Sequence, residues 1–301
     1  MSQQLKDRLS KIGLGIWFGL FLLFLYGPIL VMLVLSLQNS NGGSTFPAKG
    51  LVTGYWYSYL GSSNLAAIRH AAVVSLFLAL IVGLISSSLS LSLIMAYRRM
   101  SRRLGRALLY LVLLSLMTPG VLLSLGMTLW WKLLGFNVAL YPAGLGVQVA
   151  WAIPFGFLVM LAIFNRYDVA VEEAARDLGA SAVQTFTRVT LPIIWGGVVG
   201  AALFGFTLSW NEFERTLLVS PTATLPLEIY GELISAPLQP YFYALGVITT
   251  FATIALVFAM LIIVAFIIRR TTRTQAAALE EDTPGAEAAI PSLSTPALEG
   301  A

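Results

Sequence analysis

Cysteine is absent from this sequence of 301 residues, and histidine occurs once, at position 70. Without cysteine the chain can form neither a disulfide bond nor a thiolate metal site, and a single histidine is too few for a histidine-rich metal centre. Charged residues are also scarce, at 11% of the chain, whereas a typical soluble domain has about a quarter. This composition excludes an ordinary soluble globular protein.

Two motifs of catalytic proteins are missing as well. A nucleotide-binding phosphate loop ends in Gly-Lys-Ser/Thr, and no lysine in this sequence follows a glycine. The Gly-x-Ser-x-Gly elbow of serine hydrolases does not occur either. We therefore expect no catalytic residue, metal site or bound cofactor in this chain. Any use of ATP would need a separate polypeptide.

Long apolar runs are what the sequence has in abundance. Hydrophobic residues make up 58% of it, and its mean hydropathy is +0.84. A helix needs about 20 apolar residues to cross the roughly 30 Å hydrocarbon core of a bilayer. The sequence therefore predicts an all-α integral membrane protein with six transmembrane helices, at residues 14–37, 71–96, 107–131, 143–164, 192–211 and 241–268.

Two of these runs have features that bear on packing. The fifth contains four glycines, and because small residues let helices approach closely in lipid, we expect it to be an interior helix. Prolines occur in or near three runs, at positions 28, 119 and 154, where we expect kinks.

The basic residues predict the orientation of the six spans. Fourteen of the eighteen fall on one side of the membrane: Lys6, Arg8, Lys11, Arg98, Arg99, Arg102, Arg103, Arg106, Arg166, Arg176, Arg188, Arg269, Arg270 and Arg273. Because basic residues stay on the cytoplasmic side, we expect a multi-pass inner-membrane protein with both termini in the cytoplasm. The net charge of +4 is therefore explained by the orientation of the protein in the membrane. We expect membrane lipids, and not nucleic acid, as its partners.

Three regions are expected along the chain. Residues 1–13 form a cytoplasmic N-terminus, and residues 14–268 form the six-span domain. Residues 269–301 are rich in Ala, Glu, Pro, Ser and Thr, a composition typical of a disordered cytoplasmic tail.

A polar stretch, residues 165–192, separates the fourth and fifth apolar runs. Asp168 can cap a helix that ends at Gly179, since glycine accepts the left-handed conformation at little cost. Ser181 and Gln184 have the spacing of a capping box for a second helix, which leads to Pro192. We therefore expect a short helix, a sharp turn and another short helix on the cytoplasmic face.

This stretch could rest on lipid headgroups or dock a protein. A helix lying on a membrane usually has basic residues on its polar face. Here the acidic residues outnumber the basic ones, which favours a protein partner; the acids are Asp168, Glu172, Glu173 and Asp177, and the bases are Arg166, Arg176 and Arg188.

The same stretch resembles the EAA loop of permease subunits of ATP-binding-cassette (ABC) importers. That pattern is Glu-Ala-Ala, three residues, Gly, nine residues, Ile, one residue and Leu-Pro, with Val189 at the Ile position here. In the family this loop is a coupling helix that docks in a groove of the ATPase. The resemblance implies ATPase coupling through Glu173, Ala174, Ala175, Asp177, Leu178, Gly179, Leu191 and Pro192.

Three further motifs resemble the spermidine/putrescine branch of these permeases, in particular its second permease subunit. They are DLGAS (177–181), FTLS (206–209) and LPLEIY (225–230). The resemblance implies the permease fold of a type I ABC importer and a polyamine substrate. Its partners would be a second permease, two ATPases that use ATP and Mg, and a periplasmic or lipid-anchored binding protein. Permeases for sugars, ferric iron or amino-acid-like compounds remain alternatives.

Residues after FTLS are candidates for the solute path. Some polyamine permeases have two acids there, and this chain has Trp210, Asn211 and Glu212. The Trp ring could face an ammonium group and the Glu could supply an opposite charge, so we expect these three residues at the outer mouth of the path. The alternative is a solvated loop that docks the binding protein.

Two other classes of protein compete with an ABC permease. A secondary transporter would need intramembrane acids or broken spans, and runs two, three, four and six contain no Asp or Glu. A membrane scaffold or sensor would bind partners without moving a solute.

Overall fold

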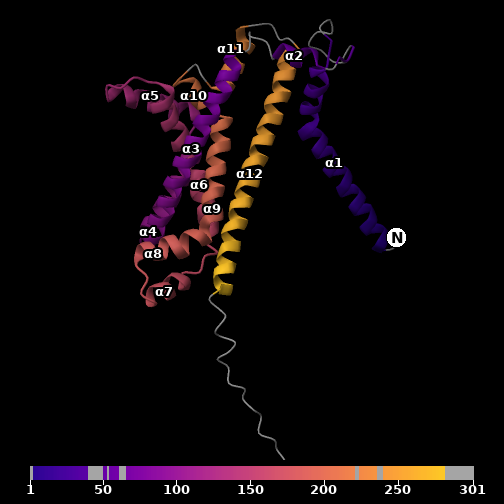
Figure 1. Ribbon diagram of the computed structural model, residues 1–301. Coiled ribbons are helices and arrows are strands. Elements are labelled where there is room, and N and C mark those ends of the chain that lie inside the picture. Colours follow the sequence, from indigo (N-terminus) through magenta and orange to yellow (C-terminus); the bar gives the residue numbers. More distant parts are fainter. Residues whose placement is uncertain are drawn as a thin grey trace, which may run out of the picture. The chain divides into compact units, whose positions relative to one another are not determined.

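The computed structural model describes residues 3–39, 50–52, 54–60, 66–220, 224–235 and 240–281 (Figure 1). Nearly all regular structure in these ranges is helical, apart from an isolated bridge between Gln38 and Leu51. The α-helices are α1 (Gln3–Ser36), α2 (Tyr55–Leu60), α3 (Ala66–Arg99), α4 (Arg102–Leu116), α5 (Gly120–Leu133), α6 (Leu145–Phe164), α7 (Ala170–Asp177), α8 (Ala182–Thr185), α9 (Leu191–Trp210), α10 (Glu214–Leu217), α11 (Leu225–Ser235) and α12 (Tyr241–Glu281). Two π-helical segments, η2 (Leu140–Gly144) and η3 (Phe186–Thr190), precede α6 and α9.

The chain divides into two compact units, Met1–Ala255 and Leu256–Ala301. All packing described below lies within the first unit. In the second, α12 continues to Glu281. Residues 269–281 of the predicted disordered tail are therefore helical, and residues 282–301 lie outside the described part of the chain.

Membrane-length helices confirm the all-α membrane fold. In the described ranges, five helical stretches are long and apolar enough to span a bilayer: Ser10–Ser36, Ala66–Arg99, Leu140–Phe164, Ala182–Trp210 and Tyr241–Ile262. A sixth span is possible if α4 and α5 together form one crossing.

The third predicted span, 107–131, needs correction because it is broken. Helices α4 and α5 meet at a bend of 102°, and Pro119 is the N-cap residue of α5. Proline lacks an N–H and disfavours helical geometry at the residue before it, so α4 ends ahead of Thr118. Pro28 and Pro154, in contrast, lie inside α1 and α6.

The centre of the first unit is formed by α3, α6 and α9, and small residues allow their close approach. A Cβ atom at Gly83 of α3 would lie 2.8 Å from the carbonyl oxygen of Ala202 in α9. The Ser90 hydroxyl of α3 donates a hydrogen bond of 3.0 Å to the Ile153 carbonyl of α6. Helix α9 buries Gly197, Ala201 and Gly205, which confirms that the glycine-rich run is an interior helix.

Candidate functional site

The polar stretch between α6 and α9 folds as a helix, a turn and a second helix. The Asp168 carboxylate accepts the Ala170 N–H at 2.9 Å at the start of α7, and Gly179 turns the chain with φ +88°. Ser181 and Gln184 form the complete capping box of α8. These contacts confirm the local structure expected from the sequence.

The second helix of this stretch differs from a short separate one. Helix α8 has four residues and continues through η3 into α9, whose first turn contains Pro192. Helical structure thus extends without a gap over Ala182–Trp210, 29 residues. This continuous helix is bent, because α8 runs across the end of α9 (Figure 1), and it connects the turn that follows α7 with Trp210 at the end of α9.

The eight residues assigned by resemblance fall into two groups. Glu173, Ala174, Asp177, Leu178 and Gly179 are exposed, and Ala175 is half-buried. Leu178 is 90% exposed, the highest value among the exposed large hydrophobic side chains of the described residues. A large apolar side chain that projects from a polar turn is typical of a docking surface.

Leu191 and Pro192 form the second group and do not share that surface. Leu191 packs against the buried cluster of α3, α6 and α9, and Pro192 begins α9. Their position indicates that they join the loop to the bundle.

The sequence reasoning missed the contact that fixes the loop to the bundle. Glu172 is 12% exposed, and its Oε1 lies 3.1 Å from Nη1 of Arg98 at the end of α3. The same oxygen accepts a hydrogen bond of 3.1 Å from the Thr190 hydroxyl. The Arg98 guanidinium also lies over the rings of Phe164 and Tyr167, at 4.7 and 5.2 Å.

These contacts determine two pKa values. Burial of Glu172 acts to raise the pKa of its carboxyl, but the hydrogen bonds from Arg98 and Thr190 outweigh it, so the net pKa lies below the ordinary value. Burial raises the pKa of the Tyr167 phenol. Glu172 is therefore a carboxylate at neutral pH.

We expect Glu172→Gln to destabilise the protein in a pH-dependent way. The folded-state pKa is lowered, so the charged form contributes stability above the unfolded pKa of about 4.5, and this contribution disappears as the pH falls through the folded pKa. The loss should be about 1.5–3 kcal/mol at pH 7. The measurement is thermal unfolding of both proteins across pH. A difference that stays constant down to pH values below both pKa values would contradict the electrostatic account.

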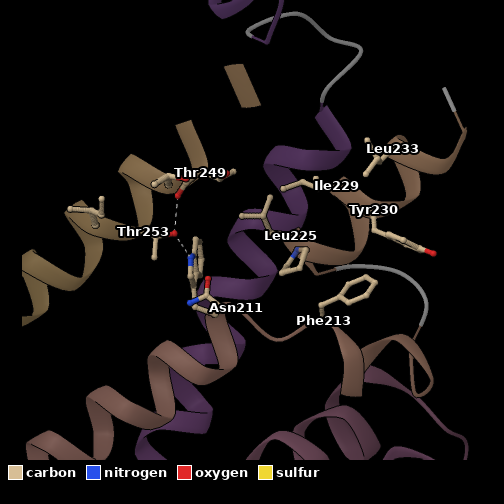
Figure 2. Close-up of a pocket in the computed structure, with 12 residues that line it drawn as sticks. Asn211, Phe213, Leu225, Ile229, Tyr230, Leu233, Thr249 and Thr253 are labelled. Carbon is tan, nitrogen blue, oxygen red and sulfur yellow. Dashed lines mark hydrogen bonds between the residues drawn. The ribbon is translucent and has the colours of Figure 1, made fainter. Parts of the chain in front are cut away.

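A cavity of about 570 Å³ lies among α9, α11 and α12 (Figure 2). Trp210 and Asn211, two of the three predicted path residues, belong to its wall. The other residues are Phe213, Leu225, Pro226, Ile229, Tyr230, Leu233, Thr249, Thr250, Thr253 and Ile254. The cavity thus combines aromatic rings, aliphatic side chains and uncharged polar groups.

The polar groups in the wall of this cavity offer a solute mainly hydrogen-bond acceptors. The hydroxyls of Thr249, Thr250 and Thr253 donate to backbone carbonyls one helical turn earlier, at 2.7–3.0 Å. The Trp210 indole N–H donates to the Thr253 hydroxyl at 2.8 Å, and the Asn211 amide donates to the Thr207 carbonyl at 3.0 Å. Oxygen lone pairs and aromatic faces therefore remain for a solute.

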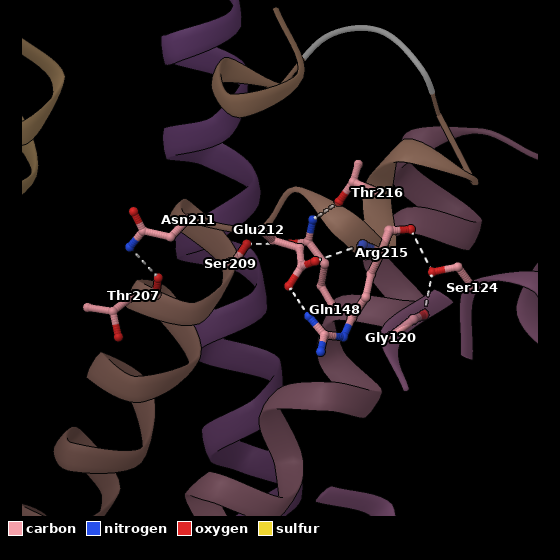
Figure 3. Close-up of polar contacts among 9 residues, drawn as sticks. All are labelled: Gly120, Ser124, Gln148, Thr207, Ser209, Asn211, Glu212, Arg215 and Thr216. Carbon is pink, nitrogen blue, oxygen red and sulfur yellow. Dashed lines mark hydrogen bonds and ion pairs between the residues drawn. The ribbon is translucent and has the colours of Figure 1, made fainter. Parts of the chain in front are cut away.

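Glu212, the third of the predicted path residues, is not part of the wall of this cavity. Its side chain is 5% exposed and lies 2.7 Å from Nη1 of Arg215 (Figure 3). Its second oxygen accepts the Arg215 backbone N–H at 2.8 Å. The guanidinium of Arg215 also lies 3.8 Å from the Trp151 ring centroid. The spacing of three residues between Glu212 and Arg215 was the sequence signal for this pairing.

A hydrogen-bond network surrounds the Glu212–Arg215 pair (Figure 3). Ser124 of α5 donates to the Arg215 carbonyl at 2.8 Å. Gln148 of α6 donates to the Thr216 hydroxyl at 2.8 Å and accepts from Ser209 of α9. The network joins four helices next to Trp210 and Asn211, so it positions the part of the cavity wall that these two residues form.

The described residues include several helices of membrane length, three of which pack together as the α3–α6–α9 core, with a polar helix–turn–helix between α6 and α9; these features define a polytopic α-helical membrane protein. The chain belongs to the family of binding-protein-dependent transport system inner membrane components, whose sequence profile matches residues 88–273. This range contains both the polar loop and the cavity.

Individual relatives agree with this assignment. The chain is 28% identical over 246 residues to the spermidine/putrescine transport system permease protein PotC of Escherichia coli K12, covering 80% of this chain and 88% of PotC. It is 27% identical over 223 residues to the putrescine transport system permease protein PotI of the same organism, covering 69% and 75%.

Solved structures show the same fold. A bacterial ABC transporter involved in the import of the acidic polysaccharide alginate matches with a TM-score of 0.65 at 20% identity, covering 88% of this chain and 96% of that chain. The fold thus agrees with the family match, and the expected class is confirmed by that match: the protein is a multi-pass permease subunit of a type I ABC importer in the inner membrane.

Proposed function

We propose that this permease subunit imports a polyamine of the putrescine and spermidine type. The observation that carries the proposal is the cavity that includes Trp210 and Asn211. Its oxygen acceptors suit the N–H donors of a protonated amine, and its aromatic rings suit the positive charge. The relatives that transport spermidine and putrescine support the same substrate class.

The absence of a charged side chain from the wall of this cavity suits transport. A path must bind its solute strongly enough to admit it and weakly enough to release it. Acceptor oxygens and aromatic rings attract an ammonium group, while a buried carboxylate would hold it much more tightly.

We further propose that import proceeds by alternating access, driven by a separate ATPase that uses ATP and Mg. A second permease would form the other half of the solute path. A binding protein, periplasmic or lipid-anchored, would deliver the solute on the side opposite to both termini, which lie in the cytoplasm. Glu173, Ala174, Ala175, Asp177, Leu178 and Gly179 would dock the ATPase. Movement of that surface would reach Trp210 through the continuous, bent helix Ala182–Trp210.

The test is ATP hydrolysis by the purified complex in lipid vesicles, with binding protein and one solute at a time: putrescine, spermidine, a sugar or ferric iron. We expect stimulation by the polyamines alone. Stimulation by another solute would contradict the proposed polyamine substrate but not the proposed ATP-driven import. A rate of ATP hydrolysis that no solute changes would contradict both proposals.

A cavity variant sharpens this test. Asn211→Lys places a cation in the wall, and two unit charges about 4 Å apart repel by about 4 kcal/mol at an effective dielectric constant of 20. Half-maximal stimulation by spermidine should then require at least about tenfold more solute. Asn211→Gln is the matched control, because it changes length without adding charge.

A further inference from the structure

A second cavity of about 570 Å³ lies where α3 ends and α4 begins. Three guanidinium groups line it, from Arg98, Arg102 and Arg106, together with Tyr97 and Ser101. We define these five residues as the arginine pocket. We propose that the arginine pocket binds the phosphate of an anionic phospholipid headgroup.

The charges of the arginine pocket have little compensation within the chain. No Asp or Glu occurs between residues 8 and 167. Arg98 is paired with Glu172, but neither Arg102 nor Arg106 has a carboxylate partner among the described residues. These two arginines are one helical turn apart, and like charges at this spacing repel each other. A shared anion would relieve that repulsion.

The chemistry of the arginine pocket suits phosphate. A guanidinium presents several N–H donors in a planar fork that matches phosphate oxygens. The side chain of the N-cap residue Ser101 accepts no capping hydrogen bond, and its hydroxyl can donate to a phosphate oxygen. The Tyr97 ring lies over Gly105, where a Cβ atom would approach the ring to 3.3 Å. Glycine therefore allows this wall of the pocket to form.

The surroundings favour a lipid over a free phosphate ion. Leu104, Tyr110 and Leu111 of α4 are 60–66% exposed, and they belong to the first half of the broken membrane span. Acyl chains can cover this apolar surface while the headgroup occupies the pocket. The basic residues place the pocket at the cytoplasmic surface, where anionic lipids attract arginine.

The arginine pocket is also connected to the polar loop. Arg98 lines the pocket, and its Nη1 lies 3.1 Å from Oε1 of Glu172. The end of α3 and the start of α4 lie at the same end of the helices as α7 and α8 (Figure 1). A bound headgroup would therefore lie one side chain away from the segment that we propose docks the ATPase.

The experiment measures phosphatidylglycerol binding to the purified complex in phosphatidylcholine nanodiscs, by native mass spectrometry and thermal unfolding. Arg102→Gln/Arg106→Gln removes two charges from the pocket. Arg99→Gln/Arg103→Gln is the matched control, because it removes two charges from the same stretch but outside the pocket. Each double variant keeps three arginines there, so the topology signal is equal.

We expect wild type and the control to retain phosphatidylglycerol and to gain thermal stability from it. The pocket variant should bind it at least about tenfold more weakly. If the pocket variant does not assemble, the single variants Arg102→Gln and Arg106→Gln give the same comparison with Arg99→Gln.

Several results would overturn the proposal. Equal loss in both double variants would mean that general surface charge binds the lipid, and no loss in either would mean that the pocket is not a lipid site. Displacement of phosphatidylglycerol by millimolar inorganic phosphate would assign the pocket to the free ion. A defect only in ATPase subunit retention would assign it to a protein contact.

Discussion

The Gly179→Val variant is expected to lose most of its solute-stimulated ATP hydrolysis, by at least about tenfold. Gly179 has φ +88°, and a side chain in this conformation costs about 1–2 kcal/mol. A Cβ atom there would meet nothing within 4 Å, so the effect comes from the backbone and not from a clash. The turn would open and alter the angle between α7 and α8.

Gly135 provides the matched control for this variant. It has φ +78° and no neighbour within 4 Å of a Cβ position, but it follows α5 and not α7. Gly135→Val should therefore lose similar stability and keep full stimulation. Gly179→Asn should retain much of the activity, because asparagine accepts the left-handed conformation. Full stimulation in Gly179→Val would show that the turn does not transmit the signal.

The Glu212→Gln variant is expected to lose about 3–5 kcal/mol of stability, because it leaves the arginine of a buried pair without its partner. Glu212 and Arg215 are 5% and 11% exposed. Replacing both partners removes the uncompensated charge, so Glu212→Gln/Arg215→Met should recover most of the loss. The measurement is thermal unfolding in one lipid, together with spermidine-stimulated ATP hydrolysis.

The two readouts distinguish a positioning role from a solute contact. If the pair only positions Trp210 and Asn211, the double variant regains both stability and stimulation. A stable double variant that no longer responds to spermidine would instead mean that Glu212 contacts the solute. Glu214→Gln is the control, because Glu214 is exposed and its loss should change neither quantity.

Local features of the sequence predicted the elements but not all of their limits. Membrane-length apolar runs predicted the spans, because each run is a property of consecutive residues. The cap at Asp168, the turn at Gly179 and the capping box of Ser181 and Gln184 were also predicted, since each needs only neighbours in the chain. Pro119 was expected to kink a span, but the 102° bend that breaks it was not foreseen.

Long-range contacts could not be predicted in this way. Arg98 and Glu172 are 74 positions apart, and only the packing of α3 against the loop brings them together. The cavity combines residues from three helices, none of which has a motif that identifies the others. The position of Glu212 directly after the FTLS motif predicted a residue of the solute path, but the turn after α9 directs its side chain to Arg215.

The sequence by itself determined that this is a polytopic membrane protein with a polar helix–turn–helix loop, because apolar length, caps and glycine turns act between near neighbours. Its class, a permease, came from the resemblance of that loop to the EAA loop and from the family match. Only the tertiary structure decided which charges pair, and which arginines of the arginine pocket have no carboxylate partner among the described residues. The physical reason is that a charge in an interior of low dielectric constant depends on whichever groups packing places within a few ångströms of it. Those groups come from distant parts of the chain.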